Sequence, residues 1–349
     1  MNVALNYLKE NQERLGLERF GAPDEFAFLQ LTPRFRASSH VIFLLMKKTT
    51  GELALVVKIP RLPQLAHGIE HEARVLKLLN KQASEIRGTV PEVVAFEAYA
   101  GWPILVQTGL QGRLMDPKTV RSNRDLACRT VTDWLVRLHS APAGEKLAPD
   151  DWFKNQVESP ICFLREKFPL NAEEGKLLEK TWKIAQAVAP PAYFPVVEHS
   201  DLSHPNLIWI AEKEVGVVDW ETAELAGLPV CDLYTFLNYV ATSKVQGKAI
   251  QTYSKASSEA FFGTKAWAAE FVEIYARRLE LPTPILHPLF VLTWLRIMVS
   301  QLQRVSGPQP DEAQPSTETV NWLRANRFYT LWKQSLAHPE SFLAGLAGG

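Results

Sequence analysis

Two stretches, His199-Ser200-Asp201-Leu202-Ser203-His204-Pro205-Asn206 and Val217-Val218-Asp219-Trp220-Glu221, carry the strongest signal in the sequence. Each places carboxylates next to an apolar, β-like run. Phosphoryl transfer from a nucleotide needs a carboxylate that orients and deprotonates the attacking hydroxyl. It also needs oxygen ligands for a Mg²⁺ ion that bridges the phosphates. The two stretches supply both kinds of group.

The spacing of these residues predicts one shared site. Asp201 and Asn206 lie on the same short loop, so both side chains can face a single cleft. The β-like runs 206–210 and 215–218 then form a hairpin that returns Asp219 toward the same metal. The alternative is a solvated polar turn beside a strand, and the downstream Asp-Trp-Glu makes that alternative the weaker one.

These motifs resemble the catalytic loop and metal loop of the aminoglycoside phosphotransferase and choline kinase family, small-molecule relatives of protein kinases. The segment 223–233 contains Gly-x-Pro and then Asp-Leu, the pattern that follows the metal loop in this family. The resemblance implies that Asp201 is the catalytic base and that Asn206 and Asp219 are the metal ligands. His199 and Asp232 would hold the loop by hydrogen bonds. Ser200 stands where many members have Gly.

The N-terminal third of the chain can be compared with what nucleotide binding requires. Five strands are predicted, at 26–31, 41–46, 53–59, 92–99 and 102–107, with a helix at 68–79 after the third. Lys58 ends the third strand, where it can reach the α- and β-phosphates. Glu72 on the helix would hold that lysine, and it is preferred to Glu70 because it precedes an Ala-x-x-Leu-x-x-Leu face.

Two loops complete the predicted nucleotide site. The phosphate-covering loop lies between Leu31 and Val41 and contains no glycine, so Ser38 and Ser39 would donate hydroxyl hydrogen bonds in its place. Arg34 and Arg36 in the same loop would either contact phosphate or lie solvated on a hairpin face. The backbone of Gln107 and Gly109 occupies the position of an adenine-binding hinge.

Beyond residue 112 the pattern becomes helical. Helices are predicted at 121–139, 172–189, 232–241, 265–279, 286–303 and 320–336. The chain is therefore expected to have an α+β, two-lobed protein-kinase-like fold. A small antiparallel sheet with one helix forms the nucleotide-binding lobe (1–106), and a larger helical lobe (107–349) carries catalysis and acceptor binding.

Composition limits the possible partners. The 349 residues carry 38 Lys+Arg and 38 Asp+Glu, which argues against bulk nucleic-acid binding. Three scattered cysteines form neither a disulfide framework nor a zinc site. The apolar run 285–298 is interrupted by His287, Pro288 and Arg296, so no membrane partner is expected and a cytoplasmic location is predicted.

The sequence thus predicts an enzyme, a small-molecule kinase that uses ATP or GTP with Mg²⁺. It would move the γ-phosphate to a hydroxyl of a sugar, amino alcohol or antibiotic. A polycationic aminoglycoside would favour an acidic cleft, so the nearly balanced charges after Cys231 argue mildly against this substrate. A nucleotide-binding pseudokinase scaffold is the alternative. A protein kinase is less favoured, because Asp-Trp-Glu replaces Asp-Phe-Gly.

Overall fold

The chain divides into two units in the computed structural model, which describes residues 3–32, 40–142, 144, 146–190, 194–245, 249–306 and 315–344. The first unit comprises 1–115 together with 205–223, and the second comprises 116–204 together with 224–349. The segment 205–223 therefore belongs to the sheet unit, although the sequence on both sides of it belongs to the helical unit. The lobe boundary expected at 106/107 stays a prediction.

The first unit contains the predicted five-stranded antiparallel sheet, in the order β1-β2-β3-β5-β4. Its strands are β1 (Phe26–Leu31), β2 (His40–Lys47), β3 (Leu53–Pro60), β4 (Val93–Tyr99) and β5 (Trp102–Thr108). The helix α2 (His67–Gln82) follows β3 as predicted. These elements confirm the α+β, kinase-like fold class.

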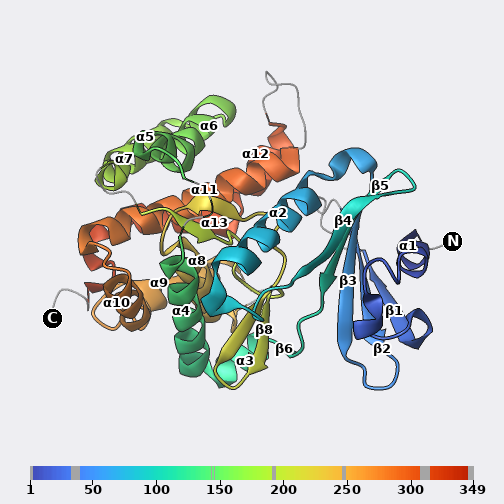
Figure 1. Cartoon of the computed structure of the whole chain (residues 1–349). Helices are drawn as coiled ribbons and strands as arrows, with labels where there is room; N and C mark the ends of the chain where they lie inside the picture. Colours follow the sequence, from blue (N-terminus) through green and yellow to red (C-terminus); the bar gives the residue numbers. More distant parts are fainter. Residues whose placement is uncertain are drawn as a thin grey trace. The chain divides into compact units, whose positions relative to one another are not determined.

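The two faces of this sheet bury different surfaces, because side chains alternate along each strand. On one face, Leu55 and Val57 of β3 pack in a cluster that includes Ala4 and Leu8 of α1 (Val3–Glu10). On the other face, α2 packs on Leu105 of β5. Figure 1 shows α1 in dark blue and α2 in pale blue. The alternation assigns Lys58, the neighbour of Val57, to the face that α2 covers.

A second, three-stranded sheet of the first unit carries the predicted metal loop. It consists of β6 (Arg113–Leu114), β8 (Leu207–Ala211) and β9 (Glu214–Val217), in the order β6-β8-β9. Gly112 has a φ of 148°, and a Cβ there would lie 2.5 Å from the Trp209 carbonyl oxygen. Glycine is required at this position because the two backbones approach so closely.

The second unit is mainly helical. Its helices include α3 (Pro117–Ser122), α4 (Arg124–Ser140), α5 (Pro149–Phe153), α6 (Ser159–Lys167), α7 (Ala172–Ala185), α8 (Cys231–Thr242), α9 (Ile250–Phe261), α10 (Ala269–Arg278), α11 (Leu286–Ser306), α12 (Thr317–Arg324) and α13 (Arg327–Ala337). A π-helical turn, η5 (Lys154–Glu158), links α5 to α6. Two short strands, β7 (Val196–Glu198) and β10 (Glu224–Gly227), pair antiparallel.

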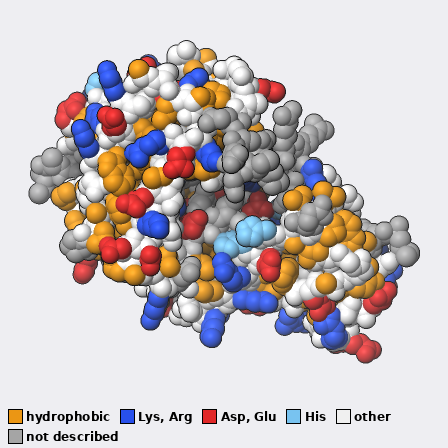
Figure 2. Space-filling model, turned by 90° about the horizontal axis from the view of Figure 1, so that it is seen from above, with side chains coloured by type: hydrophobic (Ala, Val, Ile, Leu, Met, Phe, Trp, Pro, Cys, Tyr) orange, Lys and Arg blue, Asp and Glu red, His pale blue; other side chains and the backbone are white. Residues whose placement is uncertain are grey.

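The helix α11 forms the core of this unit and packs against α6, α7, α8 and α13. The segment Thr283–Val305 is long and apolar enough to cross a membrane, but 72% of its apolar window is buried inside the protein. This burial is typical of a core helix. Over the surface drawn in Figure 2, acidic and basic side chains are interspersed, in keeping with the zero net charge.

The structure differs from the sequence prediction in three helical regions. The expected helix 320–336 is two helices, because the side chain of Asn326 caps α13 by accepting a hydrogen bond from the Phe328 N–H at 2.9 Å. The segment α5–η5–α6 and the helix α9 were not predicted. Residues 307–314 lie outside the described residues.

A carboxylate on α7 joins three helices of the second unit. Glu174 accepts two hydrogen bonds of 2.8 Å from Arg324 of α12 and one of 2.6 Å from the Tyr329 hydroxyl of α13. It also completes a capping box with Asn171, whose N–H donates to it at 2.8 Å. Burial acts to raise the pKa of Glu174, but these hydrogen bonds outweigh burial and lower it to about 2.

We expect Glu174→Gln to destabilise the protein by about 2–3 kcal/mol at pH 7, because glutamine keeps the capping box but cannot carry the charge that pairs with Arg324. The lowered pKa makes this stabilisation complete above the ordinary pKa of 4.5. It is lost as the pH falls toward 2. Urea unfolding at pH 7 and pH 3 measures it. The exposed neighbour Glu173, paired with Lys333, is the control, and an equal loss in Glu173→Gln would contradict the assignment.

Candidate active site

A buried ion triad lies in the first unit. The Lys58 Nζ donates to Glu72 Oε2 at 2.7 Å and to Asp219 Oδ1 at 2.6 Å. The side chains of Lys58 and Glu72 are 4% and 0% exposed, whereas that of Asp219 is 32% exposed. The chain thus brings together a strand residue, a helix residue and a loop residue that the sequence predicted for one site.

The electrostatics of the triad keep its lysine charged. Burial alone favours the neutral amine, but the charges of Asp219 and Glu72 outweigh it and raise the pKa of Lys58 above its ordinary value. Lys58 is therefore an ammonium throughout the physiological pH range. Its charge is shared between the buried Glu72 and the partly exposed Asp219.

The predicted metal ligands lie at one end of the β8–β9 hairpin. Asn206 directly precedes β8, and the Val218 N–H, next to Asp219, donates to the Asn206 carbonyl at 3.0 Å. Asp219 has a φ of 68°, a left-handed conformation that aspartate tolerates better than most residues. A carboxylate and an amide oxygen are the hard ligands that Mg²⁺ prefers, so the donor set fits this ion.

Two histidines contact the segment that follows Asp219, and neither contact was predicted from the sequence. His40, the first residue of β2, lies with its Nδ1 3.2 Å from Glu221 Oε2. His71 of α2 lies with its Nε2 2.7 Å from the Ala223 carbonyl oxygen. Ligand atoms of His40, Asp219 and Glu221 all lie within 4.8 Å of one another. These contacts hold the segment 219–223 against β2 and α2.

Residues 199–204 of the predicted catalytic loop belong to the second unit and follow β7. Both oxygens of the Asp232 carboxylate, in the first turn of α8, accept backbone hydrogen bonds: from the His199 N–H at 2.6 Å and from the Ser200 N–H at 2.9 Å. The Asp201 N–H donates to His199 Nδ1 at 3.2 Å. Asp201 thus projects from a turn whose backbone is held by Asp232.

Burial sets the electrostatic state of Asp232. It raises the pKa of this carboxyl to about 8, and the nearby Glu198 acts in the same direction. The two backbone N–H groups and Arg296 favour the ionised form. The pKa of Asp232, which anchors the loop, therefore depends on the charges of Glu198 and Arg296.

The predicted nucleotide-binding loops are described in part. Ser38 and Ser39 lie outside the described residues. Gln107 on β5 is 2% exposed, and its Oε1 has no hydrogen-bond partner among the described residues. The Gly109 N–H donates to the Ala54 carbonyl at 2.9 Å. A Cβ on Gly109 would lie 2.3 Å from the Leu53 carbonyl oxygen, so close approach to β3 requires glycine.

Three tryptophans of the helical unit have different surroundings. Trp294 and Trp332 are fully buried in the core, whereas Trp322 is exposed. His139 is also buried, and its Nδ1 lies 2.5 Å from the Tyr275 hydroxyl, which accepts the Val230 N–H at 3.0 Å. Because burial lowers the pKa of His139 to about 3, its ring is neutral and packs within the unit.

We expect Ser200→Gly to stabilise the protein by about 1 kcal/mol. Ser200 has a φ of 66°, and its Oγ is buried without a hydrogen-bond partner among the described residues. Glycine removes both costs, which outweigh its larger entropy loss on folding. Thermal unfolding measures the change. Ser203→Gly in the same loop, where φ is not positive, is the control and should destabilise. Destabilisation by Ser200→Gly would contradict this account.

Comparison with known proteins gives a family match. The model of a family described as "Phosphotransferase enzyme family" matches residues 36–271, about two thirds of the chain. No curated protein matches the sequence.

Solved structures share the fold at low sequence identity. The GDP complex of aminoglycoside 2'-phosphotransferase-IIIa is 13% identical, covers 95% of this chain and 99% of its own, and has a TM-score of 0.54. Choline kinase LicA from Streptococcus pneumoniae is 15% identical, covers 94% of this chain and 99% of its own, and has a TM-score of 0.53. The streptomycin–ATP complex of APH(2")-IIa is 13% identical over 93% of this chain and 97% of its own, with a TM-score of 0.52.

The extent of the family match and the fold agree with the resemblance found in the sequence. This chain belongs to the phosphotransferase enzyme family.

Proposed function

We propose that this small-molecule phosphotransferase moves the γ-phosphate of ATP or GTP to a hydroxyl of a small polar acceptor. The observation that carries the proposal is the Lys58–Glu72–Asp219 triad, in which a buried ammonium bridges two carboxylates at 2.6–2.7 Å. A pseudokinase scaffold would not need to retain this triad together with Asp201 and Asn206. The nucleotides in the solved relatives, GDP and ATP, support a purine nucleotide as the donor.

In the proposed reaction, Asp201 is the general base. Its carboxylate orients the acceptor hydroxyl and accepts its proton as the oxygen attacks the γ-phosphorus. The bond between the γ-phosphorus and the β–γ bridging oxygen breaks, and the nucleoside diphosphate leaves. His199 and Asp232 support this step by holding the backbone of the loop.

Lys58 would stabilise the α- and β-phosphates, and Glu72 would fix the direction of the lysine. Asn206 and Asp219 would hold Mg²⁺, which neutralises phosphate charge when bound. Ser38 and Ser39 would contact phosphate. Because the Gly109 N–H already donates to Ala54, a purine edge would be bound by the Gly109 carbonyl or by Gln107.

The acceptor is proposed as a small hydroxyl compound, a sugar, an amino alcohol or an antibiotic. Named relatives of the fold include enzymes of aminoglycosides and of choline, which fit this range. A cytoplasmic location, where ATP and GTP are available, is part of the proposal, as is the absence of a nucleic-acid or membrane partner.

We expect Asp201→Asn to lower kcat by about 10³-fold or more, because asparagine keeps the shape but cannot accept the proton. A panel of sugars, amino alcohols and antibiotics is incubated with Mg²⁺ and ATP or GTP, and mass spectrometry detects the gain of one phosphate. Asp133→Asn, an exposed aspartate of α4 paired with Arg278, is the control. Transfer that survives in Asp201→Asn would overturn the base assignment.

We expect Glu72→Gln to lower kcat/KM for the nucleotide by about 10- to 100-fold, because Lys58 loses a charged partner and its fixed direction. Glu70, an exposed carboxylate on the same helix, provides a matched control, since Glu70→Gln removes the same charge. Equal kinetics in the two variants would contradict the role of Glu72.

A further inference from the structure

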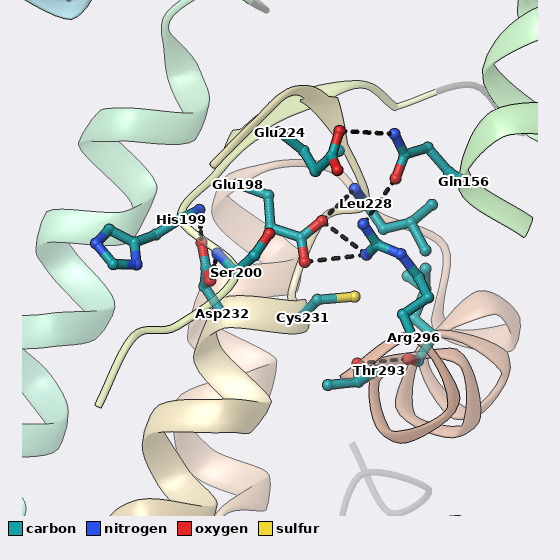
Figure 3. A network of polar contacts seen from close by, with 12 residues as sticks. Gln156, Glu198, His199, Ser200, Glu224, Leu228, Cys231, Asp232, Thr293 and Arg296 are labelled. Carbon is teal, nitrogen blue, oxygen red and sulfur yellow. Dashed lines mark hydrogen bonds and ion pairs between the residues drawn. The ribbon is translucent and has the colours of Figure 1, made fainter. Parts of the chain in front are cut away.

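A guanidinium is largely buried in the second unit, where the side chain of Arg296 is 13% exposed. Arg296 is on α11 among the buried residues Leu292, Leu295 and Val299. Its Nη1 donates to both oxygens of Glu198, at 3.0 and 2.7 Å, and its Nη2 donates to Gln156 Oε1 at 2.7 Å. Figure 3 shows these groups converging between β7, α11 and η5.

Stability alone does not explain this pair. Removing two charges from water is costly, and well-packed apolar residues of similar volume often replace a buried ion pair without loss of stability. A bidentate carboxylate–guanidinium pair instead fixes the orientation of the two side chains relative to each other, because both groups are planar. The question is therefore what Arg296 holds in place.

Glu198 is the last residue of β7 and directly precedes His199, so it stands where the catalytic loop begins. Its Oε2 also accepts the Leu228 N–H at 3.0 Å, in the segment that enters α8. A Cβ on Gly227 would lie 2.5 Å from both the Cβ and the Oε2 of Glu198. The glycine leaves the room that lets this carboxylate turn inward.

The same network reaches the loop anchor. Asp232 accepts hydrogen bonds from the backbone N–H groups of His199 and Ser200. The nearby charge of Glu198 raises the pKa of Asp232, and the charge of Arg296 lowers it. Gln156 extends the network to Glu224 of β10 at 3.4 Å. Glu198, which directly precedes the loop, is therefore paired with Arg296, and Asp232, which anchors the loop backbone, lies near both charges.

We propose that Arg296 is a positioning residue for the catalytic loop: by holding Glu198 against α11 and η5, it fixes the strand end from which Asp201 projects. This inference rests on the proposed function for its effect on turnover. Its structural part, the fixed loop, can be tested without any substrate.

The test compares Arg296→Met, Arg296→Lys and the double variant Glu198→Leu/Arg296→Met with the wild-type chain. Hydrogen exchange followed by mass spectrometry reports on the peptide that covers 196–204. In Arg296→Met we expect these amides to exchange at least about ten-fold faster. We expect kcat to fall about 10- to 100-fold while KM for the nucleotide stays within about three-fold, because the reacting geometry is lost but nucleotide binding is not.

The double variant separates positioning from charge compensation. Replacing both members by apolar residues should restore resistance to unfolding but neither the slow exchange nor kcat, since nothing then fixes the strand end. Arg296→Lys keeps the charge without the planar fork and should be intermediate. Arg324→Met, which breaks the remote pair with Glu174, is the control and should leave the 196–204 exchange unchanged.

Recovery of kcat and slow exchange in the double variant would overturn the proposal, because Arg296 would then be needed only as a counter-charge. Wild-type exchange in Arg296→Met would also overturn it. If Arg296→Met fails to fold, Arg296→Lys and the double variant decide the question. A wild-type chain that phosphorylates no acceptor would refute the proposed function, whereas loop exchange would still test the positioning.

Discussion

The requirement that a buried charge be paired governs both units of this protein. In the part of the chain that the structure describes, each unit holds a buried cation by partners from distant segments: Lys58 by Glu72 and Asp219, and Arg296 by Glu198 and Gln156. Taking such a cation out of water costs several kcal/mol unless its partners lie at hydrogen-bonding distance. The strand, helix and loop that supply those partners are therefore held in register by the charge itself.

The two cations serve the proposed chemistry differently. Lys58 is buried and pairs with Asp219, which is partly exposed, and its proposed partners are the nucleotide phosphates. Arg296 is enclosed by Glu198 and Gln156 and acts on the loop that carries Asp201. In the proposed function, one unit would supply the groups for phosphate and metal, and the other would supply the base Asp201.

The parts of the site that could be predicted were those encoded over a few neighbouring residues. The loop 199–206, the Asp-Trp-Glu segment and Lys58 at the end of an apolar strand are local patterns, and the five strands around Lys58 follow from β-branched runs. The contacts of His40 and His71 could not be predicted, because each joins residues far apart in the chain and neither histidine has a distinctive neighbourhood. Arg296 is recognisable in the sequence as a charge within an apolar run, but the sequence does not indicate which carboxylate it pairs with. The short strand β7 was missed because its few buried residues have no periodicity.

The division of the chain affects how the protein is made on the ribosome. Residues 1–115 emerge first, yet their unit is completed only by 205–223, which includes Asp219. Until that segment has been synthesised, β6 lacks its neighbour β8, and Lys58 has only Glu72 of its two partners. The strand β6 therefore stays unpaired while about 100 further residues are translated, a delay of roughly 5–20 s at typical rates. An incomplete chain that ends before 205 would retain the five-stranded sheet but not the β8–β9 hairpin.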